Sequence, residues 1–82
     1  MKVLVNVYVP AIGQGYDVLV PEDMRIRNVV SLIVGAVAES SSQLYVPSGE
    51  ECLCSVEKNI LLRANATLDK YGIQNGDHLI MM

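Results

Sequence analysis

The sequence has 82 residues, of which 51% are hydrophobic and 18% are charged, so residues 1–82 can form one small domain but have no room for two cores. Six Lys and Arg against nine Asp and Glu leave a net charge of −3, which argues against a nucleic-acid or anionic-membrane surface, because both need concentrated positive charge. One His, two Cys and scattered carboxylates also argue against an enzyme.

The amino-terminal part of the chain is typical of a β-hairpin. Between residues 3 and 9, valines alternate with other side chains, and a period of two with β-branched residues on one face predicts a strand. Pro10 ends this run, and the segment 10–15 contains two glycines, which predicts a loop. Residues 16–20 form a second predicted strand. Because the loop is short, we expect the two strands to pair antiparallel.

A helix is predicted next. Pro21 breaks the second strand, and Asp23 is a predicted N-cap, because its carboxylate can accept the free backbone N–H groups of a first turn. The helical spacing of one apolar face is carried by Ile26, Val29, Val30, Ile33, Val34 and Val37. Gly35 costs about 1 kcal/mol relative to Ala in a helix, and we explain it by a close approach of the helix to a strand. The helix is expected to end at the serines 40–42, before a long connection at 43–51.

The carboxy-terminal half returns to strands. The expected elements are a strand at 52–56, a polar turn at 57–59, a short strand at 60–62, a helical turn at 67–73, a tight turn at 75–77 and a final strand at 78–82. Thr67 is the predicted cap of the helical turn, and Gly72 is predicted to close it in a left-handed conformation.

This order of elements is that of an α+β β-grasp fold, in which a mixed sheet of four to five strands packs on one main helix. The sequence also resembles a family. Residues 67–79, which read TLDKYGIQNGDHL, are similar to the segment that leads into the last strand of ubiquitin-like proteins. The entry into the helix at 20–23, and its start at Ile26, Asn28 and Val29, match the ubiquitin pattern too.

Within that fold family, the pattern Gly-Ile-x-Asn-Gly-Asp-x-Leu at residues 72–79 looks most like the bacterial YukD/EsaB group. Those proteins are small ubiquitin-like accessory proteins of type VII (WXG100) secretion systems in Gram-positive bacteria. The resemblance implies a non-enzymatic, protein-binding module. Its implied partner is a cytoplasmic domain of a membrane-bound secretion component.

Two other functions stay open at this point. Conjugating ubiquitin-like proteins and sulfur carriers end in a flexible Gly-Gly tail, whereas residues 79–82 read Leu-Ile-Met-Met and are predicted to lie in a strand. We therefore expect a non-conjugating protein. A sulfur or thiol carrier, acting through Cys52 and Cys54 or through a missing tail, is one alternative. A stand-alone ubiquitin-like scaffold is the other.

No catalytic, cofactor or metal site is predicted. His78 is the only imidazole and is expected to be a solvated strand residue, while Glu50 and Glu51 are expected to be solvated at a loop. Cys52 and Cys54 are one residue apart, and adjacent pairs of this kind rarely form structural disulfides, so we expect two reduced thiols in the core. A zinc or iron–sulfur site would need further ligands that the sequence does not offer.

The sequence also predicts a cytoplasmic location. Its longest apolar run, at 29–38, has about half of the roughly 20 residues that a membrane crossing needs. The amino-terminal residues do not have the pattern of a signal peptide. We therefore expect no insertion into a membrane.

One face of the predicted sheet is the candidate binding surface. The face toward the helix is expected to hold Val3, Val5, Val7, Val18, Val20, Cys54, Leu62, Leu79 and Met81. The other face would then present Leu4, Tyr8, Leu19, Leu53, Leu61, Ile80 and Met82. A solvated sheet face is normally polar, so an apolar one indicates a protein interface. A homodimer through this face is expected at high concentration, and a register slip of one residue within 52–62 would shrink the patch.

Overall fold

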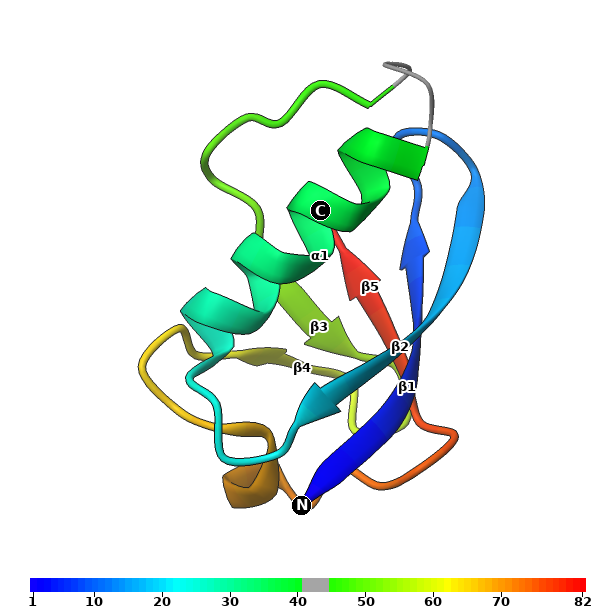
Figure 1. Ribbon diagram of the computed structural model, residues 1–82. Coiled ribbons are helices and arrows are strands. Elements are labelled where there is room, and N and C mark those ends of the chain that lie inside the picture. Colours follow the sequence, from blue (N-terminus) through cyan, green and yellow to red (C-terminus); the bar gives the residue numbers. More distant parts are fainter. Residues whose placement is uncertain (41–44) are drawn as a thin grey trace.

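The computed structural model describes residues 1–40 and 45–82. Figure 1 shows one twisted sheet with a single long helix lying across one of its faces. The elements are β1 (Lys2–Val9), β2 (Gln14–Pro21), α1 (Ile26–Ser40), β3 (Leu53–Ser55), β4 (Ile60–Leu62), the short 3₁₀ helix η1 (Leu68–Tyr71) and β5 (His78–Met81).

The strands are arranged in the order β2-β1-β5-β3-β4. The first and last strands of the chain, β1 and β5, pair in parallel at the centre of the sheet, and all other pairs are antiparallel. This mixed five-stranded sheet with one main helix confirms the predicted ubiquitin-like β-grasp fold.

The core lies between the sheet and α1. The valines of β1 at positions 3, 5, 7 and 9 all point into it, as their alternation predicts. The helix contributes one face, namely Ile26, Val29, Ile33 and Val37. Val30, Val34 and Val18, which we also expected in the core, are only half-buried. Burying each fully buried side chain of this size stabilises the folded protein by about 1.5–3 kcal/mol.

The helix begins later than predicted, and Asp23 is not its cap. α1 starts at Ile26, and Asp23 lies exposed in the preceding turn. The amide groups of Ile26 and Arg27 donate instead to the carbonyl oxygens of Ala66 and Ala64, at 2.8 and 2.9 Å. Because a distant loop satisfies these first-turn donors, no side-chain cap is needed there.

Gly35 does not mark a close approach of α1 to a strand, as we expected. The residue is exposed, and a Cβ built on it would find no atom within 4 Å. Its cost to the helix is therefore not offset by packing among the described residues.

The side-chain alternation in β3 is the opposite of our expectation. Leu53 is fully buried and pairs with the core residue Met81, whereas Cys54 is half-buried and lies opposite Ile80. The expectation that Leu53 lies on the exposed face is therefore wrong. Apolar or small residues occupy both faces of this short strand, so its sequence alone does not set the register. The register is set by pairing with β5.

The segment that carries the family resemblance folds as predicted. η1 is followed by Gly72, whose φ of 68° is left-handed, and Gly76 in the next turn has a φ of 88°. Thr67 precedes η1 but makes no side-chain cap, because its hydroxyl donates to the carboxylate of Asp69 instead. These turns lead directly into β5, which pairs with β1.

Candidate functional site

A row of apolar side chains crosses the face of the sheet that α1 leaves uncovered. The strand register places Tyr8 opposite Ile80, Ile80 opposite Cys54, and Cys54 opposite Leu61. We call these four residues the outer row. Tyr8 is 43% and Leu61 59% exposed, and the other two are half-buried.

Met82 lies beside the middle of the outer row, two residues beyond Ile80 along the chain. Reciprocal backbone hydrogen bonds of 2.8 and 3.0 Å pair Met82 with Cys52, so that their side chains lie on the same face of the sheet as Cys54 and Ile80. Met82 is 61% exposed. The register therefore brings together four of the seven predicted interface residues, namely Tyr8, Leu61, Ile80 and Met82.

Leu4 and Leu19 form a separate apolar pair. They lie opposite each other on β1 and β2 and are exposed. Asn6 and Asp17 are the next pair along these strands on the same face, and the Asn6 side-chain amide donates to the Asp17 carboxylate at 3.1 Å. The predicted patch is thus divided in two by polar groups.

A second polar contact continues this division across β5. His78 lies opposite Asn6, and its Nδ1 atom is 2.6 Å from Oε2 of Glu57. The His78 backbone amide also donates to both Glu57 oxygens, at 2.9 and 3.1 Å. Hydrogen bonds from the His78 ring and amide hold the pKa of Glu57 below its usual value. His78 is exposed as predicted, but no local pattern indicates its carboxylate partner, which lies 21 residues away.

The two thiols are free, as predicted, but they are not in the core. Cys52 and Cys54 are both half-buried and lie on the same face as the outer row. Burial raises the pKa of Cys54, and the neighbouring Cys52 raises it further through charge and a hydrogen bond. Cys54 therefore has little thiolate at neutral pH, which makes it a weak nucleophile.

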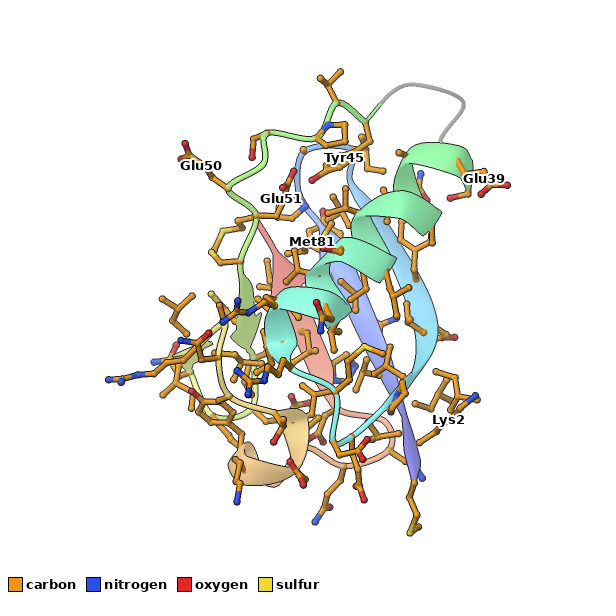
Figure 2. All side chains as sticks on the ribbon, turned by 60° about the vertical axis from the view of Figure 1, so that its left-hand side comes forward. Lys2, Glu39, Tyr45, Glu50, Glu51 and Met81 are labelled. Carbon is orange, nitrogen blue, oxygen red and sulfur yellow. The ribbon has the colours of Figure 1, made fainter. Side chains whose placement is uncertain are left out.

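The segment that leads into β3 is organised by Glu51, which we expected to be solvated. The Tyr45 hydroxyl and the Ser48 amide donate to its Oε2 atom at 2.8 and 2.7 Å, and the Gly49 amide donates to Oε1 at 3.1 Å. Figure 2 shows Glu51 directed toward Tyr45, whereas Glu50 points away from the molecule. Burial alone would raise the pKa of Glu51, but these hydrogen bonds lower it, while burial and Glu51 raise that of Tyr45 to about 12.

Within residues 1–40 and 45–82, no group of three or more His, Cys, Asp or Glu side chains is placed to hold a metal ion. No helix in the described part of the chain has the length and hydropathy needed to cross a membrane.

Comparison with solved structures supports the fold. The EccD5 ubiquitin-like domain from Mycobacterium xenopi is 19% identical with a TM-score of 0.79, covering 100% of this chain and 93% of that one. The ubiquitin-like domain of the Mycobacterium tuberculosis type VII secretion system protein ECCD1 is 13% identical with a TM-score of 0.78, covering 100% and 98%. A chain of the MycP5-free ESX-5 inner membrane complex is 22% identical with a TM-score of 0.82, covering 99% of this chain and 20% of that one.

Comparison with curated proteins found no match. The family described as "WXG100 protein secretion system (Wss), protein YukD" matches residues 4–81, which is nearly the whole chain. The chain therefore belongs to the YukD family of WXG100 protein secretion systems.

Proposed function

We propose that this protein is a non-enzymatic, protein-binding accessory module of a type VII secretion system, and that the outer row is its docking surface. The proposed partner is a cytoplasmic domain of a membrane-bound secretion component, which places this protein in the cytoplasm. The observation that carries the proposal is the apolar row that crosses four strands on the uncovered face of the sheet.

The composition of this face supports binding. An uncovered sheet face is normally polar, because its side chains are in water. Here Tyr8, Leu61 and Met82 are each more than two-fifths exposed. Covering each of them contributes on the order of 1 kcal/mol or more. The polar contacts between Asn6 and Asp17 and between His78 and Glu57 flank the row, as a polar rim flanks the apolar centre of an interface.

The class of partner is supported by the structural likeness to secretion proteins. The chain of the ESX-5 inner membrane complex that resembles this protein is about five times longer, since the aligned part covers 20% of it. In that complex the ubiquitin-like fold is thus part of a larger chain. We propose that a separate ubiquitin-like chain reaches a comparable membrane assembly by docking.

The test is a charge placed in the row. Tyr8→Glu is expected to keep the fold, because Tyr8 is 43% exposed, and to abolish binding to the cytoplasmic domain of the membrane-bound secretion component encoded nearest to this gene. Leu32→Glu is the matched control, since Leu32 is 53% exposed on α1, and it should bind normally. Binding is measured by isothermal titration calorimetry, and folding by circular dichroism.

Two outcomes would contradict the proposal. If Tyr8→Glu binds the partner domain as tightly as the wild type, the outer row is not the docking surface for it. If Tyr8→Glu abolishes only self-association, as measured by analytical ultracentrifugation, the row is a homodimer contact instead.

A further inference from the structure

A groove separates the amino-terminal half of α1 from the β4 edge of the sheet, and we call it the edge groove. Its volume is about 610 Å³, which is within the range of about 300–1,000 Å³ typical of ligand sites. Its apolar lining includes Val30 and Val34 from α1 and Leu53 and Leu62 from the sheet. Figure 2 views the molecule with this side turned forward.

The edge groove has apolar surface that the fold leaves open. Val30 and Val34 belong to the core-facing stripe of α1, yet both stay half-buried because they border the groove. Its wall beyond Val34 is the segment 47–52, which Glu51 fixes by accepting hydrogen bonds from the Ser48 and Gly49 amides. The groove is thus held open by ordered contacts, which lowers the entropy cost of binding.

The charges around the edge groove are unevenly placed. Arg27 and Arg63 both line it and are exposed, and the bond from the Arg27 amide to the Ala64 carbonyl brings their backbones together. Across residues 1–40 and 45–82, the one contact between a carboxylate and a basic side chain is that of Glu57 with His78, so neither arginine is paired with a carboxylate there.

The other charged group of the edge groove is Glu51. Both of its oxygens already accept hydrogen bonds. Figures 1 and 2 place its segment beside the carboxy-terminal half of α1 and the loop after β4 beside the helix start. One end of the groove is therefore cationic, although the protein as a whole has a net charge of −3.

We propose that the edge groove binds a short segment of a protein partner that carries bulky apolar side chains and, at one end, a carboxylate. The apolar side chains would cover Val30 and Val34, and the carboxylate would be held by Arg27 and Arg63, whose guanidinium groups suit bidentate pairing. Two arginines beside an apolar floor are too few for a nucleic-acid backbone.

This inference does not rest on the proposed function. The edge groove lies mainly on the helix side of the sheet and the outer row on the opposite side. Leu61, a member of the outer row on the edge strand β4, and Cys52 also line the groove. A partner on the outer row would therefore leave most of the groove open. One protein could then join two others.

The test uses a displayed library of short random peptides, selected on the wild-type protein. We expect the selected peptides to combine bulky apolar residues with Asp or Glu. Arg27→Glu and Arg63→Glu should each lower their affinity about tenfold, because each removes a charge-assisted contact. Lys2→Glu is the matched control, since it makes the same change of charge on the exposed start of β1, away from the groove, and it should bind normally.

Both arginine variants should fold. Arg63 is exposed, and Arg27→Glu places a carboxylate in the first turn of α1, where the helix dipole favours it. NMR shifts on adding a selected peptide should centre on the methyl groups of Val30 and Val34. Peptides without acidic residues, affinities unchanged by the arginine variants, or shifts centred on Tyr8 and Ile80 would each overturn the inference. Loss of partner binding in Tyr8→Glu with normal peptide binding separates the two sites.

Discussion

The imidazole Nδ1 atom of His78 lies 2.6 Å from the carboxylate Oε2 atom of Glu57. Glu57 also accepts the His78 backbone amide, so it ties the turn after β3 to the first residue of β5. These contacts lie at the polar boundary of the outer row, and they make the stability of this end of the sheet sensitive to pH.

Acid should weaken this contact. Because the pKa of Glu57 is lowered in the folded protein, its stabilising effect is present above the unfolded value of about 4.5 and is lost as the pH falls through the lower, folded value. The free energy of unfolding of Glu57→Gln should therefore decrease less than that of the wild type as the pH is lowered. Urea unfolding from neutral pH to below 4.5 measures this. Glu50→Gln is the control, because Glu50 is exposed and points outward. If it changed the pH dependence of stability as much as Glu57→Gln does, the contact between Glu57 and His78 would not be the cause.

Replacing Gly35 should stabilise the protein. The residue is exposed in the middle of α1, and a Cβ there meets no atom within 4 Å. Gly35→Ala is expected to raise the free energy of unfolding by about 0.5–1 kcal/mol, because alanine loses less conformational entropy in a helix. Ala36→Gly, at the next exposed position, should lower it by a similar amount. Thermal melting of both variants checks the pair, and a destabilised Gly35→Ala would contradict the open space at this position.

The hydrogen bond between Tyr45 and Glu51 should be detectable both in the free energy of unfolding and in the titration of the tyrosines. Tyr45→Phe keeps the buried ring but removes the hydroxyl that donates to Glu51, and should cost about 0.5–1.5 kcal/mol. The pKa of Tyr45 is raised to about 12 in the folded protein, so its contribution is full below the unfolded value of 10.0 and is lost as the pH rises through the folded value. Absorbance titration should show one late-ionising tyrosine that Tyr45→Phe removes. Tyr8→Phe, with an exposed ring, should leave that late titration in place.

The register of β3 can be tested by two neighbouring substitutions. Leu53→Ala should destabilise the protein by about 2–5 kcal/mol, because Leu53 is fully buried and its truncation leaves a cavity. Cys54→Ala should cost much less, because Cys54 is half-buried on the outer face. Chemical denaturation measures both. The reverse order of the two effects would mean that Cys54, and not Leu53, faces the core.

Long sequence patterns were sufficient to predict β1 and α1. The alternating valines of β1 and the helical spacing of α1 each repeat several times. In each case one type of element, a strand or a helix, puts all of these apolar residues on a single buried face. Gly72 and Gly76 marked turns because a left-handed backbone strongly favours glycine. The alternation of β1 also placed Leu4 and Tyr8 on the exposed face of the sheet, as predicted.

Short segments, and contacts between distant ones, depend on tertiary pairing instead. β3 has three residues with apolar side chains on both faces, so only its pairing with β5 placed Leu53 in the core and Cys54 in the outer row. The start of α1 depended on carbonyl groups of a loop nearly 40 residues further along the chain, which no local pattern contains. The contact between Glu57 and His78 forms only when β3 pairs with β5, and the edge groove forms only when the sheet packs against α1, because each joins residues that are separated in sequence.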